Sequence, residues 1–575
     1  MDLATLKKNL KKETTGLPQA NLALLGDTPT QLLAMAIKGY GIEQKLDIRL
    51  FEAEYNQVDA SVLNISSDLY QSDPRYVLIF QSAEKLVYEF YNSTKEEQKE
   101  FATQHLAKVA QYIETINSQL KCNIIYANFT ELSENIFGNY GNKIDFSFIY
   151  QLRKINLGLM DLARQYKNLF INDLASLQNQ YGRAFCFSPA LYANTGMVHS
   201  VDFLPMVAKN TLDIIQSIQG KIKKCLVLDL DNTLWGGIIG DDGMEGIQVG
   251  NLGIGETFTK FQLWIRQLKE RGIILAVCSK NEEKTAMEPF RDHPDMVLRL
   301  EDIAVFVANW DNKADNIRHI QSVLNIGFDS MVFVDDNPAE RKIVRDHLPE
   351  VTVPELPVDP AEYLPYLQQL NLFETASVTE EDGDRTRQYQ EESKRISVKK
   401  SFVNEDEFLQ SLEMTAHCNA FEKMEIPRIA QLSQRSNQFN LRTVRYTEED
   451  IYRLAASPDF YTLSFKLGDS FGDYGLVSVI ILEKQNEEDL FINTWLMSCR
   501  VLKRGLEQLV LNEIMEIAHQ HGFKRIIGEY IPTAKNQMVK AHYQGLGFTA
   551  LDKENQWYME APAYQPRKHF IKKVK

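Results

Sequence analysis

The 575-residue sequence lacks features that would assign it to several large classes of protein. No stretch reaches the roughly 18 consecutive apolar residues that a membrane-spanning helix requires. The lysine-containing start, residues 1–16, is not followed by the apolar segment of a signal peptide. Basic residues are not in excess, because 63 Lys and Arg stand against 78 Asp and Glu and the formal charge is −15. Since nucleic-acid binding needs a basic surface, we expect a cytoplasmic protein that binds neither nucleic acid nor membranes.

Cysteine is scarce and widely spaced. The six cysteines form no Cys-x-x-Cys pair and no short spacing that suits zinc or a disulfide framework. This pattern fits a reducing compartment. At about 150 residues per domain, the length predicts three or four domains.

Three blocks differ in their hydrophobic pattern. Residues 1–218 alternate short apolar runs with amphipathic stretches, which is typical of a parallel sheet covered by helices. Residues 219–375 show the same alternation, including a strand predicted at 296–300. Residues 376–575 begin with a charged stretch, 379–402, predicted as a solvated linker helix, and continue as an antiparallel run followed by a helix and a strand. We therefore predict an α/β multidomain protein with these three domains.

The middle block places chemically active side chains at the ends of predicted strands or on a neighbouring helix. They are Asp229, Asp231 and Thr233 after the first strand, Ser279 at the end of the second, Lys313, and the pair Asp335-Asp336. Parallel sheets bind ligands at the carboxyl ends of their strands. Acids that lie close together need a cation, so a divalent metal is the natural complement. Together these groups can carry out metal-assisted phosphoryl transfer by covalent catalysis; the alternative is that the acids only cap the following helices.

The order of these residues resembles the haloacid dehalogenase (HAD) superfamily, whose motifs are D-x-D-x-T, Ser or Thr, Lys, and D-D. The resemblance implies a Rossmann-like domain with bound Mg²⁺ in which Asp229 is the nucleophile and Asp231 the general acid and base. It implies further roles as follows: phosphate binding by Thr233, Ser279, Lys280 and Lys313, and metal binding by Asp229, the carbonyl of Asp231 and one acid of the final pair, with Asp336 favoured over Asp335. The short segment after Thr233 has room for a hairpin flap but not for a large cap, so we expect an open site.

Longer phrases resemble the FkbH-like branch of that superfamily (phosphatase subfamily IIIC). They are LDLDNTLWGGIIGDDG, CSKNE, NWDNKADNI, FVDDNPAER and NQFNLRTVRY, within residues 221–548. The resemblance implies a dephosphorylation coupled to transfer of a glyceryl unit from 1,3-bisphosphoglycerate to the phosphopantetheine thiol of an acyl carrier protein. Two alternatives stay open. One is a plain Mg²⁺-dependent phosphatase acting on a small phosphorylated metabolite or sugar, and the other is a scaffold that binds a carrier protein or coenzyme A with weak turnover.

The third block resembles the Gcn-five-related acetyltransferase (GNAT) fold. A basic loop immediately before a predicted helix offers backbone N–H groups and the positive end of the helix dipole to an anion. Its residues and the later tyrosine form the predicted thiol or pantetheine site: Arg500, Lys503, Arg504, Gly505 and Tyr543. Lys503 replaces a loop glycine, which favours phosphopantetheine on a carrier protein over coenzyme A. The alternative is a structural Gly-Phe turn after a basic helix start.

Two cysteines are candidates for holding an acyl group. Cys499, beside Arg500 at a predicted helix start, has a setting that favours the thiolate and is the first candidate. Cys278, beside Ser279, is the second. The alternative for either is a small core residue.

The first block resembles SGNH-type esterases at two places. Asp27 and Thr28 follow the first predicted strand, with threonine where that group has its nucleophilic serine, and His199 lies where its histidine is found. Gly196 stands where the triad acid is expected, and a threonine without that acid would be poorly activated. We expect a non-catalytic domain for docking or for a homodimer.

Overall fold

The structure is a computed structural model, and it describes residues 1–379, 383, 385–399, 402, 404–436, 438–533 and 535–574. The chain forms two compact units, Met1–Ile218 and Gln219–Lys575. The boundary between the units lies at the predicted boundary of the first domain. The predicted boundary after residue 375 lies within the second unit. No helix in the described ranges is long and apolar enough to cross a membrane.

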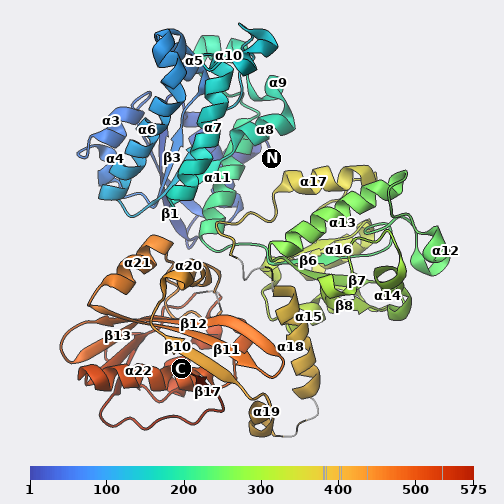
Figure 1. The fold of residues 1–575 in the computed structure, drawn as a ribbon, viewed down its shortest axis with the longest axis vertical. Coiled ribbons are helices and arrows are strands. Elements are labelled where there is room, and N and C mark those ends of the chain that lie inside the picture. Colours follow the sequence, from blue (N-terminus) through green and yellow to red (C-terminus); the bar gives the residue numbers. More distant parts are fainter. Residues whose placement is uncertain are drawn as a thin grey trace. The chain divides into compact units, whose positions relative to one another are not determined.

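The first unit contains a five-stranded parallel sheet with the order β2-β1-β3-β4-β5. Figure 1 labels two of its strands, β1 and β3. Its strands are β1 (Gln19–Gly26), β2 (Asp47–Glu52), β3 (Tyr76–Phe80), β4 (Asn123–Ala127) and β5 (Leu169–Asn172). Every residue of the central strand β3 is buried, as expected for a parallel strand covered on both faces. The helices are α1 (Leu3–Asn9), α2 (Gln31–Glu43), α3 (Val58–Leu63), α4 (Asp68–Gln71), α5 (Ala83–Tyr91), α6 (Lys95–Gln119), α7 (Phe148–Gln165), α8 (Leu174–Tyr181), α9 (Arg183–Cys186), α10 (Pro189–Thr195) and α11 (Leu204–Ile218), with a 3-10 turn at Gly138–Lys143.

The second unit begins with a four-stranded parallel sheet of the order β8-β7-β6-β9. Its strands are β6 (Cys225–Leu228), β7 (Ile274–Ser279), β8 (Ile303–Ala308) and β9 (Met331–Val334). The helices are α12 (Ile239–Gly246), α13 (Ile254–Glu270), α14 (Glu283–Asp292), α15 (Lys313–Leu324), α16 (Pro338–His347) and α17 (Tyr363–Leu370), with 3-10 turns at Leu300–Asp302, Phe328–Ser330 and Pro360–Glu362. Between Thr233 and β7, where every residue is described, the chain forms α12, α13 and a β-bridge from Gly236 to Gln248, and no inserted domain.

The strand predicted at 296–300 is wrong. The backbone N–H groups of Val297 and Leu298 donate to the side chain of Gln262, at 3.0 and 3.2 Å, instead of to a neighbouring strand. A 3-10 turn follows, and the strand at this position is β8, Ile303–Ala308. The apolar residues of 296–300 therefore belong to a loop that contacts the core. A short apolar run in the sequence is compatible with such a loop as well as with a strand.

The rest of the second unit is built on an eight-stranded mixed sheet of the order β15-β16-β14-β13-β12-β11-β10-β17. Its strands are β10 (Thr415–Asn419), β11 (Phe460–Asp469), β12 (Gly472–Lys484), β13 (Asp489–Met497), β14 (Arg525–Glu529), β15 (Thr549–Ala550), β16 (Gln556–Glu560) and β17 (Lys572–Val574). The pairs β13–β14 and β10–β17 are parallel and the other pairs are antiparallel. The helices are α18 (Arg385–Lys399), α19 (Glu405–Ser411), α20 (Ile426–Arg435), α21 (Glu448–Ala456), α22 (Leu506–His521) and α23 (His542–Gly545), with 3-10 turns at Lys423–Glu425, Cys499–Val501 and Gln537–Val539.

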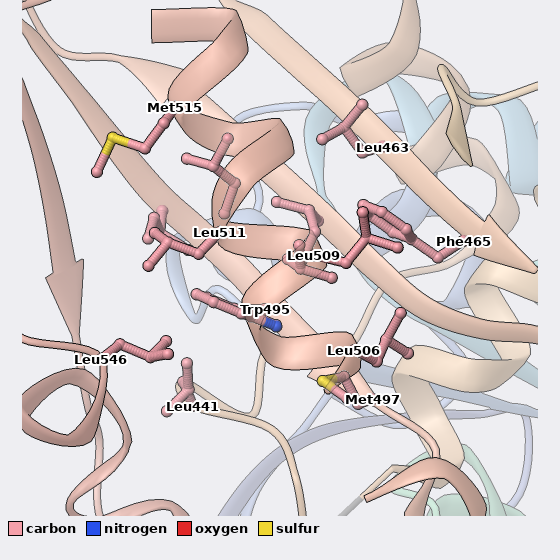
Figure 2. Packing of buried hydrophobic residues seen from close by; sticks show 14 of the residues in the cluster. Leu441, Leu463, Phe465, Trp495, Met497, Leu506, Leu509, Leu511, Met515 and Leu546 are labelled. Carbon is pink, nitrogen blue, oxygen red and sulfur yellow. The ribbon is translucent and has the colours of Figure 1, made fainter. Parts of the chain in front are cut away.

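Helix α22 supplies the core of this mixed sheet. Figure 2 shows Leu506, Leu509 and Leu511 of α22 in the same cluster as Trp495 of β13 and Phe465 of β11, and all five side chains are buried. The helix and the strands are thus joined by apolar packing. The chain as a whole is an α/β multidomain protein, in agreement with the predicted fold class.

Helix α18 was predicted to be solvated, and this prediction is wrong. The Arg395 side chain is only 1% exposed, and it donates from Nε and Nη2 to the two carboxylate oxygens of Asp469, both at 2.8 Å. Its guanidinium also lies 4.3 Å from the centre of the Tyr474 ring. On the other side, Gln390 donates to the carbonyl of Ile303 at 2.9 Å. Helix α18 therefore connects the four-stranded sheet to the mixed sheet.

We expect the substitution Asp469→Ala to destabilise the mixed-sheet part of the second unit by about 3–5 kcal/mol, because it leaves the buried Arg395 charge without this carboxylate. The measurement is urea unfolding followed by tryptophan fluorescence. Asp473→Ala is the control, because this exposed residue lies in the same hairpin and its carboxylate accepts only the N–H of Gly475 at 2.7 Å. Equal unfolding midpoints for the two variants would contradict the prediction.

Candidate active site

The predicted acids, hydroxyl and lysine of the middle block lie at one edge of the four-stranded sheet. Leu228, the last residue of β6, is in register with Val277 of β7 and Val334 of β9. Because the three strands are parallel, Asp229, Ser279 and Asp335 all lie at their carboxyl ends. This is the edge at which open α/β sheets bind ligands.

The turn that follows Asp229 is fixed by its own hydrogen bonds. The carbonyl of Leu230 accepts the N–H groups of Thr233 at 3.1 Å and Leu234 at 2.7 Å. Asn232 adopts a left-handed conformation, with φ of +53°, and its side chain accepts the N–H of Gly237 at 3.0 Å. Asparagine tolerates this conformation better than most residues do. The chain therefore reverses within two residues of Asp231.

Lys313, the first residue of α15, joins the two acidic strand ends. Its ammonium group lies 2.8 Å from a carboxylate oxygen of Asp229 and 2.5 Å from one of Asp335, and the lysine side chain is 3% exposed. Burial opposes the charge of Lys313, but the two carboxylates raise its pKa above the ordinary lysine value. Burial, with the Asp229 charge next, raises the pKa of Asp335 and of Asp336. The site is therefore a buried cluster with more carboxylates than cations.

Three of these acids have the arrangement of a metal site. One carboxylate oxygen each from Asp229, Asp335 and Asp336 lies within 4.8 Å of the others. Lys313 offsets one negative charge, so a divalent cation suits the remaining charge. Carboxylate oxygens are the ligands that Mg²⁺ prefers. The donor set thus fits Mg²⁺, with Asp336 half-buried and Asp335 fully buried.

The carboxylate of Asp231 is not part of that oxygen cluster. It accepts three hydrogen bonds, from the indole N–H of Trp235 at 3.0 Å, the backbone N–H of Ile239 at 3.0 Å and the side-chain amide of Asn281 at 2.8 Å. Asn281 also donates to the hydroxyl of Ser279 at 3.3 Å. Trp235 and Asn281 are both buried. These three donors fix the Asp231 carboxylate in one orientation beside Ser279.

The sequence interpretation missed three contributors to the site. Trp235 and Asn281 lie within the motif phrases, but their contact with Asp231 depends on how the loops after β6 and β7 fold. Arg341 of α16 donates to the carbonyls of Asp335 at 2.8 Å and Asp336 at 2.7 Å, which fixes the loop after β9. Arg341 also lies within a motif phrase, FVDDNPAER, but the phrase does not show that its side chain turns back to these two carbonyls.

Two residues predicted to bind phosphate are engaged elsewhere. The hydroxyl of Thr233 accepts the backbone N–H of Asp336 at 3.1 Å, so Thr233 holds the loops after β6 and β9 together. The ammonium group of Lys280 lies 2.6 Å from a carboxylate oxygen of Glu340. The structure therefore brings Ser279 and Lys313 to the acidic edge and gives Thr233 and Lys280 structural contacts.

The predicted thiol-binding residues do not converge on one point. Arg500 donates to the hydroxyl of Ser498 at 3.1 Å and to the carbonyl of Tyr474 at 3.3 Å. Arg504 is buried and lies 3.9 Å from the Asp469 carboxylate. The intervening turn uses two left-handed residues, Lys503 with φ of +59° and Gly505 with φ of +83°. Arg500 and Arg504 thus contact different partners, Arg500 the loop residue Ser498 and Arg504 the carboxylate of Asp469.

Tyr543 is a core residue in this structure. Its ring stacks on Trp557, with 5.6 Å between ring centres, and burial raises the pKa of its hydroxyl. The ring packs directly over Gly528 of β14, where a Cβ atom would lie 2.3 Å from it. The side chain of Cys499 lies outside the part of the chain that the structure describes. Burial raises the pKa of Cys278 to about 12, which disfavours its thiolate.

The first unit buries its three esterase-like residues. Asp27 accepts the backbone N–H of Ser82 at 2.9 Å and the Ser82 hydroxyl at 3.3 Å, and burial raises the pKa of Asp27 to about 6. His199 packs against the ring of Phe80, and burial lowers its pKa to about 4. In this fully described unit, no hydrogen bond joins Thr28 to His199. The expectation of a non-catalytic domain stays a prediction.

Comparisons with known proteins add to this geometry. Residues 21–216 match the family of FkbH N-terminal domains. A solved structure from Bacteroides fragilis, the N-terminal part of a protein containing a phosphatase domain complexed with Mg, is 53% identical. The match covers 66% of this chain and 100% of that chain, with a TM-score of 0.64. No curated protein sequence matches the chain.

Acetyltransferase structures match a smaller part of the chain. The ribosomal-protein-S18-alanine N-acetyltransferase of Escherichia coli is 13% identical, with a TM-score of 0.21, over 26% of this chain and 94% of that one. The GNAT domain of an S. lividans protein is 14% identical, with a TM-score of 0.21, over 25% of this chain and 89% of that one. Matches at this score do not establish a shared fold, so the GNAT-like assignment stays a prediction.

Proposed function

We propose that this chain, which belongs to the same family as the phosphatase-domain protein from Bacteroides fragilis and matches the FkbH N-terminal domain at residues 21–216, is a Mg²⁺-dependent phosphatase that works through an aspartyl phosphate. One observation carries this proposal. A buried lysine lies between two carboxylates, 2.8 Å from Asp229 and 2.5 Å from Asp335, at the carboxyl ends of parallel strands. A carboxylate nucleophile, a phosphate-binding cation and a metal-ligand cluster are thereby in one place.

In this mechanism an oxygen of Asp229 attacks the phosphorus atom of the substrate, and the bond from phosphorus to the leaving oxygen breaks with its electron pair on that oxygen. Asp231 supplies a proton to the leaving oxygen. Water then attacks the phosphorus atom, Asp231 takes the proton of that water, and inorganic phosphate leaves with Asp229 restored. Lys313 and Ser279 hold the phosphoryl oxygens. Mg²⁺, held by Asp229, the carbonyl of Asp231 and Asp336 or Asp335, would offset the negative charge that gathers there.

We propose further that the substrate resembles 1,3-bisphosphoglycerate and that an acyl unit passes to a carrier-protein thiol. Attack by Asp229 on an acyl phosphate would release a carboxylate that has lost its activation. Dephosphorylation and acyl transfer are compatible if they take place at different groups of the substrate. Asp229 would then remove the phosphate ester, while a thiolate would attack the carbon of the acyl phosphate and displace phosphate from that carbon. Between Thr233 and β7, where every residue is described, the chain forms no inserted domain, which supports access of a carrier protein unless another domain of this chain covers the site.

A plain phosphatase is the second candidate, and five of the six thiols are poor acceptors for an acyl-enzyme. Burial raises the pKa of Cys122, Cys278 and Cys418 to about 12 and that of Cys186 to about 11. Burial also raises the pKa of Cys225. Thiols with raised pKa values are poor acyl acceptors at neutral pH. An acyl-enzyme would therefore have to use Cys499, and a direct transfer would use only the thiol of the carrier.

Asp229→Asn tests the phosphatase proposal. We expect phosphate release from a phosphorylated substrate with Mg²⁺ to fall at least about a thousandfold, because the nucleophile is removed. Asp292→Asn is the matched control, since this exposed acid ends α14 away from the strand ends. Release by Asp229→Asn at the control rate would contradict the mechanism.

Asn281→Leu tests the positioning of Asp231. The substitution removes the amide that contacts both Asp231 and Ser279, so we expect kcat to fall about tenfold to a hundredfold with little change in KM. Hydrolysis should slow most, and intact-mass spectrometry should then detect phosphorylated enzyme accumulating during turnover. The control is Asn251→Leu, an exposed asparagine in the segment before α13. An unchanged kcat would show that Asn281 does not position Asp231.

The acyl transfer is tested by weighing the carrier protein. The protein is incubated with Mg²⁺, 1,3-bisphosphoglycerate and a holo acyl carrier protein, and we expect the carrier to gain the mass of a glyceryl unit. Phosphate release without that mass gain supports the plain phosphatase. If there is no phosphate release and no mass gain, the result supports the scaffold. Cys499→Ala, with Cys418→Ala as its control, shows whether the acyl unit passes through Cys499.

A further inference from the structure

Trp310 lies in the loop that joins β8 to α15, and this residue is 75% exposed. The chain has five tryptophans, and the other four are buried or partly buried: Trp235, Trp264, Trp495 and Trp557. Among the described residues, Trp310 makes no hydrogen bond, aromatic contact or cation–π contact. Tryptophan side chains ordinarily pack in a core or at an interface. The faces of this indole are therefore available to a ligand.

The β8–α15 loop, residues 309–312, is fixed by hydrogen bonds of its own residues. The side chains of Asn309 and Asn316 exchange two hydrogen bonds, at 3.2 and 2.7 Å. The side-chain oxygen of Asn309 also accepts the N–H of Asp311 at 3.0 Å. The side chain of Asn312 accepts an N–H from the first turn of α15 at 2.7 Å. The loop thus presents its exposed indole from a defined backbone, as a binding residue requires.

The β8–α15 loop lies beside two residues of the proposed active site. Ala308, the last residue of β8, is in register with Ser279, and the N–H of Asn309 donates to the carbonyl of Ser279 at 3.2 Å. Lys313 follows Trp310 by three residues, so the Cα atoms of these two residues are at most about 11 Å apart. Trp310 is therefore close to both groups that are proposed to hold the phosphoryl oxygens.

The proposed proton donor for the leaving oxygen lies on the same side of the site as this loop. The strand order β8-β7-β6-β9 places the acids that follow β9 on one side of Asp229 and places Ser279 on the other side. Asp231 is joined to Ser279 through the side-chain amide of Asn281. A leaving group that takes its proton from Asp231 would therefore extend toward β7 and β8, away from β9.

A second exposed apolar side chain lies next to the proposed proton donor. Ile238 is 43% exposed, and it precedes Ile239, whose backbone N–H donates to the carboxylate of Asp231 at 3.0 Å. Exposed apolar side chains thus occur both near the phosphate-binding groups and near Asp231. A leaving group with an apolar surface matches this arrangement better than a fully polar one does.

We propose that Trp310 determines substrate specificity by packing its indole against the organic part of the leaving group. This inference rests on the proposed phosphatase function and names the substrate class: a phosphate monoester whose leaving group has a planar or apolar face. An indole binds such a face through offset stacking and burial of apolar area. A glyceryl unit is small and polar, so the indole would contribute little to its binding.

The test compares two non-hydrolysable ligands, phenylphosphonate and methylphosphonate, titrated calorimetrically into the full chain with Mg²⁺ present. We expect the wild type to bind phenylphosphonate about tenfold more tightly, because only this ligand offers a ring to the indole. Trp310→Ala should reduce this preference to less than about twofold, whereas Trp310→Phe should retain most of it, because phenylalanine keeps an aromatic face. The control is Met424→Ala, which changes a residue that is 92% exposed in the turn before α20 and should keep the wild-type preference.

Phosphate release gives a second measurement of the same effect. With phenyl phosphate as the substrate, Trp310→Ala should raise KM about tenfold with little change in kcat, because the indole contacts the leaving group and not the reacting atoms. With acetyl phosphate, KM should change less than about twofold, since this substrate has no ring.

The outcomes separate this inference from the phosphatase function. An equal preference for phenylphosphonate in the wild type and Trp310→Ala would overturn the role of Trp310, and so would failure of the wild type to bind phenylphosphonate. A wild type whose binding preference depends on Trp310 but which releases no phosphate would support Trp310 as a ligand-binding residue and contradict the phosphatase function.

Discussion

A buried ammonium group between two carboxylates is the interaction on which the proposed active site depends. Lys313 is almost fully buried and contacts Asp229 and Asp335, which follow two neighbouring parallel strands. Buried charges are costly unless they are paired, so the position of each of these groups constrains the other two. The hydrogen bond from the Asp336 N–H to Thr233 and those from Arg341 to the carbonyls of Asp335 and Asp336 then hold the loops that carry the acids. The acids are therefore held in place by side chains and backbone groups of the chain itself.

The two acids of the D-x-D motif have different surroundings, and this difference separates their chemical roles. Asp229 faces a cation and other carboxylates, as a metal-assisted nucleophile requires. Asp231 faces three hydrogen-bond donors from Trp235, Ile239 and Asn281. A carboxylate held by three donors keeps one orientation, which suits a group that must move protons at a defined atom. The proposed nucleophile and the proposed proton carrier thus differ through their neighbours and not through their residue type.

The two edges of the four-stranded sheet carry different side chains. Acids gather at the carboxyl ends of the strands, and lysine and arginine side chains line a cavity at the amino ends, where α18 and α20 approach. Helix α18 makes this arrangement possible, since Arg395 joins it to Asp469 of the mixed sheet and Gln390 joins it to β8. A segment with the composition of a solvated linker is therefore part of the protein interior. The charge of its Arg395 is paired with Asp469, which lies 74 residues away in the sequence.

The sequence alone determined where strands form and which reactive side chains follow them, because these features depend on the order of residues along the chain. Apolar runs ending in acids located β6 and β9, and an apolar run ending in Ser279 located β7. The order of Asp229, Ser279, Lys313 and Asp335 predicted that these residues meet at one edge, because parallel strands bring their carboxyl ends together. The D-D pair and the D-x-D motif also predicted the acidic cluster, although not which acid of the pair is more buried. The strand predicted at 296–300 failed for a reason that no local pattern shows, namely the side chain of Gln262 accepting two backbone N–H groups.

Only the tertiary structure decided the contacts between segments that are distant in the sequence. Asn281 meets Asp231, Thr233 meets Asp336, and Lys280 turns to Glu340 because of how the loops pack, and residue type does not specify those pairings. The sequence also did not predict that Arg395 and Tyr543 are buried, since a charged or polar residue is assigned to the surface until a partner or a packing site is known. A cavity of the second unit is the clearest case, because its lining residues Lys224, Arg385, Arg428, Arg435, Arg500 and Lys535 come from five separate segments. Local sequence order thus specified which groups the chain carries, and long-range packing decided which of them act together.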